Sequence, residues 1–96
     1  MAVVMIMQWP GVTPDQYEHV RNEVPWETDQ PAGGLGHIAW FEDDGLHVID
    51  VWESPEAFGA FQAERLAPGV QAAGIAGEPD VRFTDLHAQF IPDALK

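Results

Sequence analysis

Hydrophobic and polar positions follow two different periods at the start of the chain. Residues 2–9 carry no charge and are rich in Val, Ile and Met, which is typical of a strand covered on both faces. Over residues 14–24, Tyr17, Val20 and Val24 recur at spacings of three and four, so one face of this segment is apolar when it is helical. The pattern predicts a strand followed by a helix.

Capping signals mark the start of two helices. Thr13 is suited to the N-cap of the first, with Pro14 at its first position and Gln16 three residues after the cap. This arrangement satisfies backbone N–H groups that the helix itself leaves free. Ser54 and Pro55 repeat the signal, so a second helix is expected to begin there.

The second helix is expected to place Phe58, Phe61 and Leu66 toward the core. Pro68 lacks a backbone N–H and is predicted to break or kink this helix. A second short helical piece is then expected to end at Gly74, because glycine favours the conformation that closes a helix.

Two β-forming runs between residues 36 and 54 flank an Asp-Asp-Gly turn, which predicts a hairpin. With residues 44–45 as the two-residue loop, counting outward places Ala39 opposite Asp50 and His37 opposite Trp52. His37 and Asp50 are then diagonal neighbours on one face.

Residues 81–91 alternate in polarity and predict a final strand. The resulting order is β-α-β-β-α-β within a single domain spanning residues 1–96. This order predicts an α+β, ferredoxin-like fold with a four-stranded antiparallel sheet and two helices on one face.

The hairpin faces differ in composition, and the uniformly apolar face is expected to lie under the helices. That face consists of Ile38, Trp40, Ile49 and Val51, continued by Val4 and Ile6. The opposite, open face is expected to carry His37, Ala39, Phe41, Val48, Asp50 and Trp52, continued by Val3, Met5, Met7 and Trp9. Because so large an apolar surface usually marks an association site, we predict a homodimer with a pocket between its two sheets.

Charge and composition exclude several partners. Four Lys and Arg residues against sixteen Asp and Glu residues give a net charge of -12, which disfavours nucleic acid because phosphate binding requires clustered basic groups. Without cysteine, disulfides and thiolate metal sites are excluded. The apolar N-terminus lacks a basic segment and is too short to span a bilayer, so we expect a cytoplasmic protein with no membrane partner.

His37 and Asp50 are the candidate catalytic residues. A carboxylate that contacts an imidazole fixes its tautomer, which suits a general base. The alternative is a solvent-facing or interface pair without a reaction. His87, on the same face of the last strand, is a second pocket donor or a polar interface residue. With His37 and Asp50 it could form a two-His, one-carboxylate metal site.

We expect neither a metal nor another cofactor. Metal-binding HxH and HxxxH spacings are absent, as are GxGxxG, Walker and nucleophile-elbow motifs. Trp52, Phe41, Met5 and Met7 are expected to line a substrate pocket, and Trp26 is expected to fold back from its loop to cover it. Packing alone is the competing role for these side chains.

Several segments together resemble a known family. They are "TPDQY", the loop glycines before "GHIAW", and "DVWESPEAFGAF" followed by "RLAP". With the element order, they resemble the dimeric α/β-barrel superfamily, and within it small proteins related to antibiotic biosynthesis monooxygenases. The resemblance implies two sheets packed into a dimeric barrel, with a ligand pocket in each protomer between helices and sheet or at the barrel mouth.

The resemblance leaves the activity open, because the superfamily includes cofactor-free oxygenases, haem-degrading enzymes, isomerases and cyclases. The sequence lacks the Asn and Trp pattern of the haem-degrading branch. We expect a cofactor-independent monooxygenase- or cyclase-like enzyme that acts on a small apolar or aromatic metabolite, with His37 as base and Asp50 orienting it. The alternatives are a non-catalytic small-molecule-binding or stress-response dimer, and a purely structural dimer.

Overall fold

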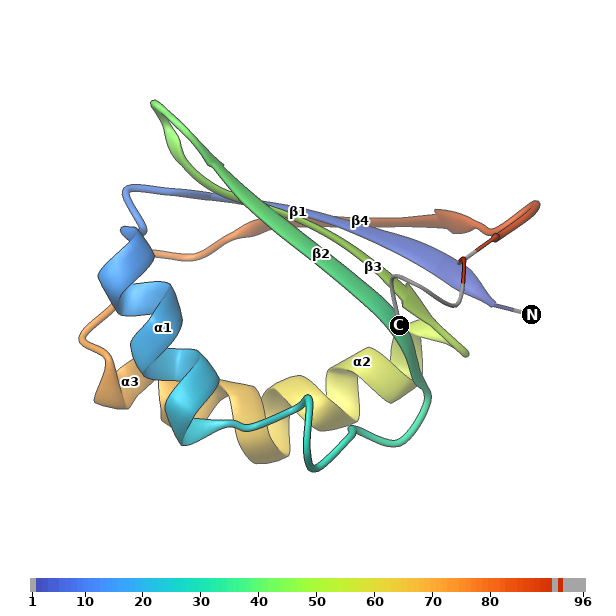
Figure 1. The fold of residues 1–96 in the computed structure, drawn as a ribbon, viewed down its shortest axis with the longest axis horizontal. Coiled ribbons are helices and arrows are strands. Elements are labelled where there is room, and N and C mark those ends of the chain that lie inside the picture. The colour runs from blue at the N-terminus through green and yellow to red at the C-terminus, as the bar shows by residue number, and fades with distance from the viewer. Residues whose placement is uncertain (1, 91, 93–96) are drawn as a thin grey trace.

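Four antiparallel strands form one sheet, and the helices lie on one side of it (Figure 1). The computed structural model describes residues 2–90 and residue 92. The elements are β1 (Val3–Pro10), α1 (Pro14–Glu23), β2 (Gly34–Glu42), β3 (Gly45–Trp52), α2 (Pro55–Phe61), η1 (Gln62–Leu66), α3 (Ala67–Ala72) and β4 (Asp80–Asp85). Their order and the strand order β2-β3-β1-β4 confirm the ferredoxin-like fold.

Both predicted helix starts are confirmed by their capping contacts. Thr13 Oγ1 accepts a hydrogen bond from Gln16 N–H at 3.2 Å, and Gln16 Oε1 accepts one from Thr13 N–H at 3.0 Å. Ser54 Oγ accepts one from Ala57 N–H at 3.1 Å. These bonds satisfy the backbone donors that each first turn leaves free.

The second helical segment continues through Pro68, so a break at this residue is wrong, but the helix is distorted directly before it and α3 follows as a short helical piece. Pro68 cannot donate a backbone hydrogen bond and its ring crowds the preceding turn. The chain accommodates it by widening η1 into a π-helical turn, in which Ala67 N–H bonds to the carbonyl of Gln62. Gly74, with φ of 70°, follows the end of α3 as predicted.

The hairpin register differs from the prediction by two residues. The turn residues are 43–44, and Gly45, the first residue of β3, has a positive φ of 130°. His37 therefore lies directly opposite Asp50. Gly45 is required because a Cβ there would lie 2.5 Å from the carbonyl oxygen of Trp9. Since the shift is even, the residues predicted to share a face still share it.

The predicted assignment of the two sheet faces is wrong, because the helices cover the face that carries His37 and Asp50. The residues of this covered face are Val3, Met5, Met7, Trp9, His37, Ala39, Phe41, Leu46, Val48, Asp50 and Trp52. The open face carries Val4, Ile6, Ile38, Trp40, Ile49 and Val51. Both faces are rich in large apolar side chains, so alternation alone does not distinguish the covered one. A buried carboxylate is tolerated under the helices because it is hydrogen-bonded.

The last strand is shorter than predicted. β4 ends at Asp85, which pairs with Val3, and Leu86 N–H makes one further bond to the carbonyl of Ala2. β1 begins at Val3, so the described residues after Leu86 have no strand to pair with. His87 therefore lies outside the sheet, and residue 91 lies outside the described residues.

The core fills part of the space between sheet and helices. Met5 is fully buried at the centre of β1, and Phe58 and Phe61 of α2 pack beside Trp52, with ring centroids 5.5 Å from it. Val20 of α1 completes this apolar layer. Within the described residues, no helix is both long and apolar enough to cross a membrane.

Candidate functional site

A cavity of about 740 Å³ lies between the covered sheet face and the helices. Its inner wall is apolar and includes Met5, Met7, Phe41, Trp52, Phe58 and Phe61. This volume is in the range of pockets that enclose small organic ligands. This pocket lies within a single chain, between its helices and its sheet, as the family resemblance implies.

The cavity opens beside α1. The exposed residues among those that line it are chiefly Glu18, Arg21, Glu27, Gln30 and Leu35. They come from α1, from the loop that follows it and from the start of β2. The mouth is therefore polar and the inner wall apolar.

A continuous chain of hydrogen bonds runs from the inner wall to the mouth. Trp52 Nε1–H donates to Asp50 Oδ2 at 3.1 Å. Asp50 Oδ1 lies 2.6 Å from His37 Nδ1, and His37 Nε2 lies 2.7 Å from Tyr17 Oη. The chain joins residues from β3, β2 and α1.

The direction of each bond in the chain follows from the chemistry of Asp50. The carboxylate of Asp50 only accepts hydrogen bonds, so His37 Nδ1–H is the donor, and in the neutral imidazole Nε2 then carries the lone pair. Tyr17 O–H then donates to Nε2. The Asp50 side chain is 9% exposed and that of His37 31% exposed. Two donors compensate the burial of the carboxylate and orient the imidazole.

Tyr17 is held as a neutral phenol. Burial is the main cause that raises its pKa, to about 12, and the nearby carboxylates of Glu18, Glu27 and Asp50 act in the same direction. The positive charge of Arg21 acts in the opposite direction and lowers the pKa of Tyr17. At neutral pH the hydroxyl therefore remains protonated and able to donate to His37.

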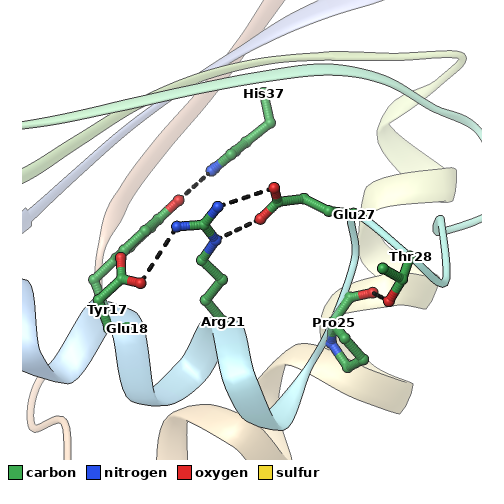
Figure 2. A network of polar contacts seen from close by, with 7 residues as sticks. All are labelled: Tyr17, Glu18, Arg21, Pro25, Glu27, Thr28 and His37. Atoms are coloured by element: carbon green, nitrogen blue, oxygen red, sulfur yellow. Dashed lines mark hydrogen bonds and ion pairs between the residues drawn. The ribbon is translucent and has the colours of Figure 1, made fainter. Parts of the chain in front are cut away.

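Arg21 connects α1 to the loop that follows it, as Figure 2 shows. Its guanidinium donates to Glu27 Oε2 at 2.9 Å, makes a second short contact through Nε to Glu27 Oε1, and reaches Glu18 Oε1 at 3.3 Å. The bond from Arg21 holds the pKa of Glu27 below its usual value. This cluster lies beside the contact between Tyr17 and His37 (Figure 2).

Aromatic rings surround the contact between Tyr17 and His37. Trp26 folds back as predicted, and its ring packs edge-on against Tyr17 and His37 at centroid distances of 5.9 and 5.3 Å. Phe41 meets Tyr17 edge-on at 6.0 Å. The packing restricts both side chains at the boundary between cavity and mouth.

Most of the predicted site residues meet at this cavity. It is lined by His37, Asp50, Trp52, Phe41, Met5, Met7 and Trp26. His87 is exposed and does not line it, and the described residues contain no cluster of three His or acidic side chains suited to a metal ion.

Sequence reasoning missed Tyr17 and Arg21 as site residues. One signal was present: Tyr17 is the only polar residue in the predicted apolar stripe of its helix, and Arg21 follows four residues later on the same face.

Comparisons with known proteins show the fold. No family model matches the chain, and no curated protein matches it significantly. SnoaB, a cofactor-independent oxygenase from Streptomyces nogalater, is 19% identical, with 96% of this chain and 97% of that chain covered and a TM-score of 0.61. A monooxygenase from the gene ActVA-Orf6 of Streptomyces coelicolor, in complex with nanaomycin D, is 19% identical, with 96% and 92% covered and a TM-score of 0.54.

A further solved structure of this fold is dimeric. It is a ferredoxin-like protein of unknown function from Thermobifida fusca, 17% identical, with 90% of this chain and 92% of that chain covered and a TM-score of 0.59. At these identities the likeness establishes the fold and leaves the activity open. The chain therefore has the ferredoxin-like fold that antibiotic biosynthesis monooxygenases also have.

Proposed function

We propose that this protein is a cofactor-independent monooxygenase- or cyclase-like enzyme that acts on a small, largely apolar aromatic molecule. His37 is the base, and Asp50 orients it. The single observation that carries this proposal is the contact of 2.6 Å between His37 Nδ1 and Asp50 Oδ1 at a cavity whose inner wall is apolar.

The proposed first step is removal of a proton from a weakly acidic C–H or O–H bond of the substrate. The product is an enolate or phenolate, and a positioned base contributes about 10²- to 10⁴-fold to such a step. In an oxygenase the anion then reacts with O₂; a methylene becomes a ketone that keeps one oxygen atom, and the other oxygen atom leaves as water. In a cyclase the same anion closes a ring.

The charge and the lining of the cavity support a neutral, largely apolar substrate. Its inner wall is apolar, while Glu18 and Glu27 at the mouth and the net charge of -12 disfavour an anion. Two of the similar structures are of oxygenases, one of them in complex with the ligand nanaomycin D, which supports a small-molecule ligand here also.

A binding module without a reaction is the second candidate. It is favoured by one observation, namely that both ring nitrogens of His37 already have partners, Asp50 and Tyr17. A pocket whose polar groups satisfy one another can hold a ligand without chemistry.

The open sheet face supports a homodimer. Its large apolar side chains include Ile38 and Trp40, which are 64% and 38% exposed. A second copy would cover this surface, and the Thermobifida fusca protein of this fold is dimeric. A cytoplasmic location also stays a prediction.

Anthrone is a suitable probe for the proposed reaction, because it is planar, apolar and carries an acidic methylene. Oxygen uptake is measured with wild type, His37→Gln and His19→Gln. The last is a matched control, since His19 is exposed on α1 and pairs with Glu23 at 3.6 Å. We expect His37→Gln to lose about 10²- to 10⁴-fold in rate and His19→Gln to lose nothing.

Binding of anthrone, followed by tryptophan fluorescence, separates the two candidate functions. Binding without turnover by wild type identifies the binding module. Equal turnover by wild type and His37→Gln refutes the proposed base.

A further inference from the structure

Neither ring nitrogen of His37 is free to meet a substrate. Nδ1 is engaged by Asp50 at 2.6 Å, and Nε2 is engaged by Tyr17 Oη at 2.7 Å. A general base must direct a lone pair at the proton it removes. The lone pair of His37 is directed at the hydroxyl of Tyr17, so Tyr17 stands where a substrate would have to be.

Tyr17 is held in this position by packing. It projects from α1 and lines the cavity. Trp26 and Phe41 contact its ring edge-on at centroid distances of 5.9 and 6.0 Å. Because displacing the ring would disrupt both contacts, a route that leaves Tyr17 in place requires less rearrangement.

We propose that Tyr17 is the catalytic residue that exchanges the proton with the substrate, and that His37 acts through it. This inference rests on the proposed function. The hydroxyl oxygen of Tyr17 has lone pairs beyond the one hydrogen that it donates to His37. It can therefore accept a proton while it passes its own proton on.

The transfer balances without an oxidant or reductant. The substrate C–H or O–H bond breaks, and a new O–H bond forms at Tyr17 Oη. The original O–H bond of Tyr17 breaks, and a new N–H bond forms at His37 Nε2. The substrate becomes an anion and His37 an imidazolium, which the carboxylate of Asp50 balances.

Arg21 is the cationic side chain that lies beside this proton transfer. Among the described residues that line the cavity it is the only Lys or Arg, and it lies one helical turn after Tyr17 on α1. Figure 2 shows its guanidinium beside the contact between Tyr17 and His37. Because Glu27 and Glu18 already pair with the guanidinium, Arg21 holds this end of the cavity in place and does not supply an unpaired charge.

Tyr17→Phe tests the inference, because it removes the hydroxyl and keeps the ring that packs on Trp26 and Phe41. The assay is exchange of the methylene hydrogens of anthrone for deuterium under nitrogen in D₂O, followed by NMR. It reports proton transfer without any step that requires O₂. We expect Tyr17→Phe to exchange about 10²-fold more slowly, while its dissociation constant for anthrone stays within about threefold of wild type.

Comparison with His37→Gln separates the two proposals. If His37→Gln loses exchange and Tyr17→Phe exchanges as fast as wild type or faster, the base stands and the role of Tyr17 is overturned. If His37→Gln and Tyr17→Phe both exchange as fast as wild type, the proposed function itself fails. A wild type that neither binds nor exchanges anthrone overturns both.

A measurement on the wild-type protein avoids any question of folding. In a crystal soaked with 1-naphthol, we expect the naphthol oxygen within hydrogen-bond distance of Tyr17 Oη. A naphthol oxygen bonded to His37 Nε2, with Tyr17 displaced, overturns the inference.

Discussion

The ionisation of Tyr17 can be measured directly, because it is the only tyrosine in the chain. In the folded protein its ring lines the cavity and its hydroxyl oxygen lies 2.7 Å from His37 Nε2. Burial and nearby carboxylates raise its pKa from 10.0 to about 12. Raising the pH is therefore a perturbation that reports on one side chain of the candidate site.

The sign of the effect follows from the raised pKa. The folded protein favours the neutral phenol, so this contribution to stability is fully present below pH 10 and is lost as the pH rises to about 12. A shift of two units is a hundredfold change in ionisation, equivalent to about 2.7 kcal/mol. Because the ring is only partly buried, solvent screening reduces its contribution to the free energy of unfolding to roughly 1 kcal/mol.

The assay is a spectrophotometric titration of tyrosinate in the near ultraviolet, with circular dichroism recorded at each pH. We expect the midpoint in the folded protein to lie clearly above the midpoint in denaturant, which is near 10. The Tyr17→Phe variant gives the tryptophan baseline. A midpoint near 10 with the circular dichroism unchanged would refute the proposed environment of Tyr17.

Two further predictions concern helix packing and assembly. A Cβ added at Gly69 of α3 would lie 2.5 Å from Cγ2 of the buried Val24, whereas one added at Gly59 of α2 would meet nothing within 4 Å. In urea denaturation, Gly69→Ala should therefore destabilise by about 1–3 kcal/mol and Gly59→Ala should stabilise by about 0.5–1 kcal/mol; equal shifts would contradict this packing. Ile38→Asp, on the open sheet face, should convert a dimer into a monomer in size-exclusion chromatography with light scattering, and a variant that remains dimeric would place the interface elsewhere.

Local signals in the sequence were sufficient to predict the element order and the helix starts. Thr13 and Ser54 cap the helices through hydrogen bonds to residues only three positions later in the chain. The helix starts are therefore determined by neighbouring residues. Alternation along the strands also predicted that His37 and Asp50 share a face, since side-chain direction in a strand has a period of two. The prediction survived the change of register because that change was even.

The tertiary structure decided which sheet face the helices cover and which residues meet His37. Both faces are apolar, so the sequence pattern could not distinguish them, and the buried Asp50 became acceptable only through bonds from His37 and Trp52. The contact between His37 and Tyr17 joins a strand to a helix twenty residues away. Such contacts depend on how the helix is placed over the sheet. The hydrophobic pattern within one segment does not predict that placement.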